Sequence, residues 1–293
     1  MVEHVVRTAM EAGLAPVVVV VGYGSDAVRA ALGDWDVTFA EQQEQRGTGH
    51  AFQTALDAVG PELETTFVLN GDGPLLRAST LKGMLEAHRE KAGGKGMVMA
   101  TLNTDRPFGM GRVVRHQDGS VAQIVEEKDA SQQQRAITEV NPGIYLFDGR
   151  ARERVVALRS DNVQGELYVT DLIGMYATAN DPVLAVPLED PSEGWAANDR
   201  AQLAVLEAEA QRRLRNAFMQ QGVTMQQPES VWLAADVSLG DDVTLEPGVV
   251  LKGATRVEAG ATVGAGSVLD SCVVTRDSVV PPLTAASGKT LPG

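Results

Sequence analysis

The strongest constraint on the fold is a six-residue repeat in the last quarter of the chain. After Pro228, apolar residues recur at this spacing, interrupted by one eight-residue step. The repeat positions are Val231, Val237, Val243, Val249, Val257, Val263 and Leu269, with Val268, Val274 and Val280 on an adjacent phase. A hexapeptide period with small residues at the corners is typical of a left-handed β-helix, a triangular prism of short parallel strands.

The length of the repeat predicts a short solenoid. At roughly eighteen residues per coil, the segment 231–280 would form fewer than three coils. We expect Val237, Val243, Val249, Val257 and Val263 to point inward, and 283–293 to run out of the solenoid without capping it. A β-hairpin array with accidental valine spacing is the alternative.

The first two thirds of the chain have a different period. Short apolar runs alternate with helical patterns, which is typical of a mostly parallel sheet covered by helices on both faces. The expected strands are 16–21, 37–40, 67–70, 96–103 and 183–186, and the expected helices are 5–12, 26–32, 50–59, 78–91 and 168–179. Strand patterns at 112–115, 121–126 and 137–147 predict an antiparallel addition. We therefore expect an α/β domain at 1–197, a connector with a long polar helix at 198–227, and a truncated β-helix at 228–293.

Charge and composition exclude several classes of protein. The chain has 25 Lys and Arg against 39 Asp and Glu, a formal net charge of −14. General electrostatics would therefore oppose binding to nucleic acid or to an anionic membrane. No apolar run approaches the length that spans a bilayer, and the first residues do not resemble a signal peptide. Cys272 stands alone, which excludes an internal disulfide and favours a small buried side chain. We expect a cytoplasmic protein.

The segment Gly22-Tyr23-Gly24 imitates a dinucleotide-binding pattern. It follows an expected strand and opens an expected helix, and Glu41 ends the next strand, where a ribose-binding acid would lie. A tight turn with Ser25 or Asp26 as the helix N-cap explains the same residues. We favour the turn and keep a dinucleotide-dependent oxidoreductase as an alternative.

Two loops have the residue types of a phosphate and nucleotide site. Gln42 begins an amide-rich stretch that runs through Gly47 and Thr48 into a helix, where glycines permit close backbone approach and Thr48 can cap the helix. Glutamine side chains donate and accept, as reading a base edge requires. Asp72 follows an apolar strand, where a carboxylate can hold Mg²⁺ against phosphates. An ordinary capped loop and a turn aspartate are the alternatives for the two segments.

These segments and five others together resemble the bacterial bifunctional N-acetylglucosamine-1-phosphate uridyltransferase/glucosamine-1-phosphate N-acetyltransferase family. The matching motifs are Gln45–Ala51, Asn70–Leu75, Gly109–Arg112, Ile124–Ala130, Glu139–Gly143, Gln164–Asp171 and Asn198–Arg200, followed by the hexapeptide repeat. The resemblance implies a Rossmann-like nucleotidyltransferase domain.

The resemblance also implies residue roles and a reaction. Gln42, Gly47 and Thr48 would contact uridine, and Gly111, Glu126 and Asn141 would contact the amino-sugar phosphate. Asp72, the residue of the catalytic site, would hold Mg²⁺ together with Asn198. UTP and N-acetylglucosamine 1-phosphate would give pyrophosphate and UDP-N-acetylglucosamine. The sugar nucleotide would be a precursor for the cell wall. The family's full β-helix forms trimers, so a homotrimer is a further expectation.

The sequence departs from the family at both ends. The family's first strand and its Gly-rich triphosphate loop do not match any segment, so we expect an unpaired position in the sheet and impaired activity. The later coils that carry the acetyltransferase site are also missing, so we expect no acetyl transfer. The alternatives are a non-catalytic sugar-nucleotide-binding protein and another sugar-phosphate nucleotidyltransferase.

Overall fold

The computed structural model describes residues 1–61 and 63–292. The chain divides into two compact units, Met1–Asn198 and Asp199–Gly293. The division lies one residue from the expected end of the α/β domain, at 197. Among the described residues, no helix has the length and apolar character needed to cross a membrane.

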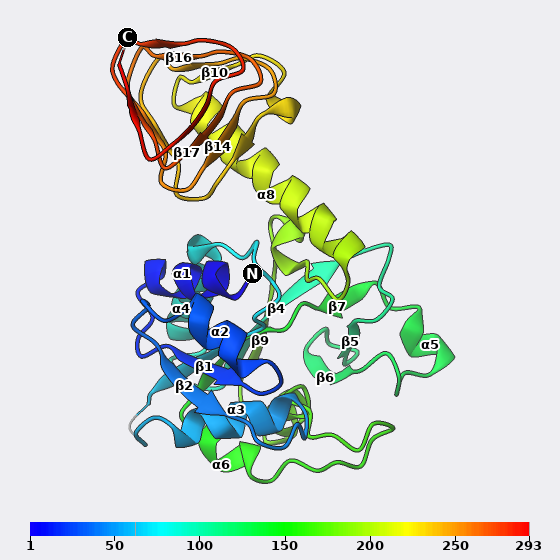
Figure 1. Cartoon of the computed structure of the whole chain (residues 1–293). Coiled ribbons are helices and arrows are strands. Elements are labelled where there is room, and N and C mark those ends of the chain that lie inside the picture. Colours follow the sequence, from blue (N-terminus) through cyan, green and yellow to red (C-terminus); the bar gives the residue numbers. More distant parts are fainter. Residues whose placement is uncertain (62, 293) are drawn as a thin grey trace. The chain divides into compact units, whose positions relative to one another are not determined.

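The first unit is an α/β domain whose elements follow the apolar and helical patterns of the sequence (Figure 1). Its helices are α1 (Val2–Glu11), α2 (Ser25–Ala31), α3 (Thr48–Asp57), α4 (Ala78–Lys91), α5 (Gln132–Arg135), α6 (Ala151–Val155) and α7 (Asp171–Thr178). Its strands are β1 (Val18–Val21), β2 (Thr38–Glu41), β3 (Thr65–Leu69), β4 (Met97–Asn103), β5 (Gly111–Arg115), β6 (Val121–Val125), β7 (Glu139–Asn141), β8 (Ile144–Asp148) and β9 (Val183–Pro187).

The larger sheet is mixed, which corrects the expectation of a mostly parallel sheet. Its order is β3-β8-β4-β7-β5-β6, with β9 beside β4. In the part of this sheet that the structure describes, only the β4–β9 pair is parallel, and β8 lies antiparallel between β3 and β4. The expected strand 137–147 is two strands, since Pro142 and Gly143 interrupt it. The expected antiparallel addition is present as β5, β6 and β7.

Helices cover both faces of this sheet because β4 and β8 are apolar on both sides. Met97 and Met99 pack with residues of α3, α6 and α7, whereas Val98 and Ala100 pack with residues of α4. Phe52 of α3 stacks on Phe147 of β8, with ring centroids 5.4 Å apart. A strand that is buried on both faces thus joins two hydrophobic layers.

β1 and β2 form a separate parallel pair. Thr38 N donates to Val17 O, and Gln42 N donates to Val21 O. The odd-numbered valines of this segment therefore direct their backbone N–H and C=O groups towards β2. Val18 and Val20 therefore direct their backbone N–H and C=O groups to the other edge, which has no strand partner among the described residues. β3 is likewise an edge strand, and its residues are only half-buried. These edges agree with the unpaired strand position expected from the sequence.

The second unit begins with a long helix and continues as a left-handed β-helix (Figure 1). In the described residues each of its three faces is a parallel sheet of four strands. These strands and the helix are α8 (Arg200–Gln220), β10 (Thr224–Met225), β11 (Trp232–Leu233), β12 (Ser238–Leu239), β13 (Thr244–Leu245), β14 (Val250–Lys252), β15 (Arg256–Val257), β16 (Thr262–Val263), β17 (Val268–Asp270), β18 (Val273–Val274), β19 (Val279–Val280), β20 (Ala285–Ser287) and β21 (Thr290–Leu291).

The solenoid is longer than the repeat predicted. Strand β10 precedes the first repeat position, and β20 and β21 lie where a run-out was expected. They join the ladder by pairing with β13, β17 and β18. Gly293, the last residue of the expected run-out, lies outside the described residues. The expectation of fewer than three coils was therefore wrong. Strands that lack the valine period still join the solenoid, because their backbones pair with the neighbouring coil.

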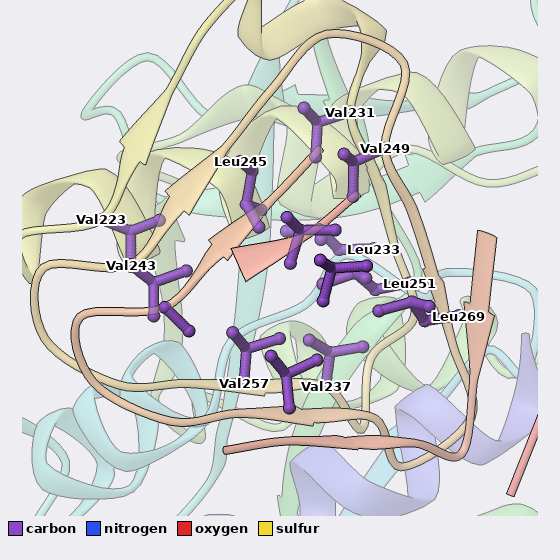
Figure 2. Packing of buried hydrophobic residues seen from close by; sticks show 14 of the residues in the cluster. Val223, Val231, Leu233, Val237, Val243, Leu245, Val249, Leu251, Val257 and Leu269 are labelled. Carbon is purple, nitrogen blue, oxygen red and sulfur yellow. The ribbon is translucent and has the colours of Figure 1, made fainter. Parts of the chain in front are cut away.

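The interior of the solenoid contains the expected valines (Figure 2). Val237, Val243, Val249, Val257 and Val263 are all buried. The first three precede their strands, whereas Val257 and Val263 are the last residues of β15 and β16. Residues two apart on a strand face the same side, so Val249 and Leu251 both point inward. The eight-residue step from Val249 to Val257 is therefore a shift of two residues to the next inward position, followed by the usual six. Cys272 is buried, as expected.

Helix α8 lies in the same compact unit as the solenoid, whereas the sequence led us to expect it in a connector. The side chain of Gln211 donates to Leu233 O at 2.7 Å and accepts from Leu233 N at 3.0 Å. One buried amide thus satisfies both backbone groups of an edge residue in the first coil. Leu214, Phe218 and Met219 add apolar contacts to the solenoid core.

Candidate functional site

The loop between β2 and α3 contains the residues expected to contact a nucleotide. Gln42 directly follows β2, and its Nε2 donates to Gly47 O at 3.1 Å. The same Nε2 lies 3.0 Å from His50 Nδ1, which is also 2.9 Å from Glu44 O. His50 is the first residue of the helix expected at 50–59, and it lies in α3. The structure adds that its ring lies against the amide of Gln42.

Gly47 has a backbone that only glycine adopts readily. Its φ is +101° and its ψ is 178°, and a Cβ there would lie 2.6 Å from Leu167 O. Gly47 is the N-cap of α3, so the expectation that Thr48 caps this helix was wrong. The Thr48 hydroxyl instead accepts from Val169 N at 3.0 Å.

Backbone bonds join this loop to the segment before α7. Leu167 N donates to Arg46 O at 2.8 Å, and Gly49 N donates to Leu167 O at 2.7 Å. This segment is part of the motif Gln164–Asp171, but nothing local in the sequence indicates that it pairs with a loop more than a hundred residues earlier. The segment around Leu167 thus holds the loop between β2 and α3 in place.

Asp72 lies in the loop after β3. Asp72 is half-buried. A Cβ at Gly73 would lie 3.8 Å from Trp195 O, so the loop borders the segment that leads to Asn198. Asn198 is exposed and has an interaction of its own. These two side chains thus come from neighbouring segments.

Three further expected residues come together on the adjacent strands β7 and β5 and directly after β6. Gly111 of β5 is paired with Asn141 of β7. A Cβ at Gly111 would lie 3.3 and 3.4 Å from the carboxylate oxygens of Glu126 and 2.7 Å from a methyl of Ile124. Asn141 Nδ2 donates to the hydroxyl of Tyr145 at 2.5 Å, and Asn141 Oδ1 accepts from Gly143 N at 3.0 Å. The glycine therefore lets a carboxylate and a methyl group lie close against the backbone of β5, next to the strand that carries Asn141.

The electrostatic environment of Glu126 is unfavourable to its charge. Burial raises the pKa of Glu126, opposed by a hydrogen bond from Thr170, and the acidic Asp171 and Asp129 raise it further. Thr170 Oγ1 donates to Glu126 Oε1 at 3.0 Å. Burial also raises the pKa of Asp171, with Asp129 adding to the effect. A ligand hydroxyl that donates to Glu126 would therefore compensate a carboxylate that is short of stabilising partners.

Asp72 and Asn198 have the donor chemistry that Mg²⁺ prefers, a carboxylate and an amide oxygen. The described residues contain no group of three or more acidic, His or Cys side chains able to hold a metal. An ion here would therefore take its remaining ligands from phosphates and water, as Mg²⁺ does in many phosphate sites. The residues fit such an ion.

The first glycine segment forms the simple turn that we favoured. Gly24, with φ of +71°, is the N-cap of α2, so neither Ser25 nor Asp26 has that role. Tyr23 between the glycines is 97% exposed.

Comparisons with known proteins agree with a nucleotidyltransferase. Residues 1–224 match the family model described as "MobA-like NTP transferase domain". The chain is 44% identical over 238 residues to the bifunctional protein GlmU of Brevibacillus brevis, covering 81% of this chain and 51% of that protein. For GlmU of Corynebacterium efficiens the identity is 42% over 246 residues, covering 81% and 50%. The chain thus spans about half the length of these relatives.

Structural similarity supports the same fold. A putative glucose-1-phosphate thymidylyltransferase from Bacillus anthracis superposes with a TM-score of 0.57 at 20% identity, covering 71% of this chain and 81% of that one. Because residues 1–224 match a model of NTP transferases, the dinucleotide-dependent oxidoreductase, our alternative for the first glycine segment, is wrong. The match over most of its length shows that the chain belongs to the MobA-like NTP transferase family.

Proposed function

We propose that this chain is a uridyltransferase that forms UDP-N-acetylglucosamine and pyrophosphate from UTP and N-acetylglucosamine 1-phosphate. The family supplies the class of reaction, nucleotidyl transfer to a sugar phosphate. The observation that carries the substrate assignment is the cluster of Gly111, Glu126 and Asn141, where a carboxylate lies against the backbone of a glycine that pairs with an amide-bearing residue. A cytoplasmic location is part of this proposal.

In this reaction an oxygen of the sugar 1-phosphate attacks the α-phosphorus of UTP. A new P–O bond forms as the bond to the β-phosphate breaks, and pyrophosphate leaves. Mg²⁺ bound near Asp72 and Asn198 would offset the negative charge of the phosphates. Gln42 and the backbone at Gly47 and Thr48 would hold the uridine.

The other residues would orient the acceptor. Gly111 lets the Glu126 carboxylate lie against the backbone of β5, and Glu126 would accept hydrogen bonds from the sugar hydroxyls. Asn141 has one remaining amide hydrogen and one lone pair to offer. Among the proposed contacts, Asp72 and Glu126 are acidic and none is basic. We therefore expect the 293-residue chain to bind UDP-N-acetylglucosamine weakly and to turn over UTP slowly.

Pyrophosphate release from UTP, Mg²⁺ and N-acetylglucosamine 1-phosphate tests the proposal. Activity should disappear in Asp72→Ala and persist in Asp57→Ala, an exposed aspartate at the end of α3. Faster release with glucose 1-phosphate or dTTP would instead identify another sugar-phosphate nucleotidyltransferase. Binding of UDP-N-acetylglucosamine with no detectable release would favour a sugar-nucleotide-binding protein. No acetyl transfer from acetyl-CoA is expected.

A further inference from the structure

A buried arginine lies directly behind the proposed sugar contacts. Arg112 follows Gly111 in β5 and is only 2% exposed. Its Nη2 donates to Glu127 Oε2 at 2.5 Å, and Glu127 follows Glu126. Successive residues of an extended chain point to opposite sides. Gly111 and Arg112 in strand β5 therefore point to opposite sides, and in the turn after β6 Glu126 lies at the proposed site while Glu127 pairs with Arg112.

The same guanidinium also connects two neighbouring segments. Arg112 donates to the carbonyl of Met110 and, at 3.5 Å, to the carbonyl of Arg135 in α5. Arg135 in turn donates twice to Glu127 O at 3.4 Å, and its guanidinium lies 3.7 Å from the Glu127 carboxylate. Arg112 thus connects the start of β5, the turn after β6 and the short helix α5.

This arrangement is better suited to fixing geometry than to adding stability. Desolvation offsets much of the attraction in a buried ion pair, and apolar residues of similar volume often stabilise a fold equally well. Among the described residues, Arg112 Nε is buried without a hydrogen-bond partner, so the arginine does not even satisfy its own donors fully. What the pair defines is the position of the turn that begins at Glu126, where Asp129 N donates to Glu126 O at 3.0 Å.

We propose that Arg112 is a positioning residue for the sugar-phosphate half of the site: through Glu127, it holds the Glu126 carboxylate beside Gly111. This inference rests on the proposed function, since it assigns a role within the same site. The uridine half should not depend on Arg112, because Gln42 and Thr48 lie on other elements and take their contacts from α3 and from Val169.

Ligand-observed NMR titration of the full chain tests this with two probes, UDP-N-acetylglucosamine and UMP, which lacks the sugar. In Arg112→Met the dissociation constant of UDP-N-acetylglucosamine should rise about tenfold, the worth of one well-placed hydrogen bond, with that of UMP unchanged. Arg112→Lys, which keeps a charge opposite Glu127, should recover most of the loss. Arg115→Met is the matched control, because Arg115 lies on the same strand and pairs with Glu139 at 2.6 Å.

Glu127→Gln provides a second test that keeps the size of the side chain, should Arg112→Met fail to fold. It should weaken the sugar-containing probe alone, by a smaller factor. Unchanged binding of UDP-N-acetylglucosamine in the folded variants would overturn the inference, as would equal losses for both probes. If the unmodified chain binds UMP but gains nothing from the sugar, the proposed function itself fails, and the inference fails with it.

Discussion

Replacing Gly47 by alanine should disrupt the nucleotide half of the site. At φ +101° and ψ 178°, a residue with a side chain is strained by about 1–3 kcal/mol. The new Cβ would also lie 2.6 Å from Leu167 O, which is backbone and cannot rotate away. The loop must then separate from this segment and lose the bonds of Gly49 and Arg46 to Leu167. Each such bond contributes about 0.5–1.5 kcal/mol.

The combined effect on the loop is at least about 2 kcal/mol, which corresponds to a roughly thirtyfold rise in the dissociation constant of UMP. Titration calorimetry measures this directly. Gly119→Ala is the matched control, since Gly119 has φ +86° but no atom within 4 Å of its Cβ position. It should lower the Tm by about 2–4 °C, the equivalent of about 1 kcal/mol, and leave UMP binding unchanged. Wild-type affinity in Gly47→Ala would refute the argument from close backbone approach.

Three further predictions concern other parts of the chain. Burial raises the pKa of Glu126, so this carboxyl favours folding when protonated, and that contribution is lost as the pH rises through its pKa in the folded state. The Tm of Glu126→Gln minus the Tm of the wild type should therefore be larger at about pH 8 than at about pH 4. A difference in Tm that does not change with pH would contradict this. Gln211→Met leaves both backbone groups of Leu233 unpaired and should cost about 2–4 kcal/mol in denaturant unfolding, whereas exposed Gln220→Met should cost little. Val268 is 38% exposed on a face of the solenoid. If the chain forms the expected trimer through its β-helix, Val268→Asp should dissociate it. Sedimentation that shows a monomer for the wild type would disprove the trimer.

Most of the secondary structure could be predicted from the sequence because it depends on local periodicity. The helix expected at 78–91 coincides with α4, and the inward valines follow from their spacing. Local patterns indicated the polar segments at Gln42–Thr48 and at Asp72 as candidate sites, whereas the roles proposed for Gly111, Glu126, Asn141 and Asn198 come from the resemblance to the family. A repeat of six or an alternation of two is visible within a few residues.

Pairing partners required the tertiary structure, because the residues that meet are far apart in sequence. Nothing near β8 indicates that it inserts between β3 and β4, or that Leu167 pairs with the loop at Gly47. The hydrogen bond from Thr170 to Glu126 likewise joins residues 44 positions apart. Strands β20 and β21 lack the valine period, yet they complete a coil because β17 and β18 offer them free backbone groups. The sequence alone thus determined which segments become strands, helices and polar loops, whereas the closure of the sheet and the solenoid decided which of their atoms meet.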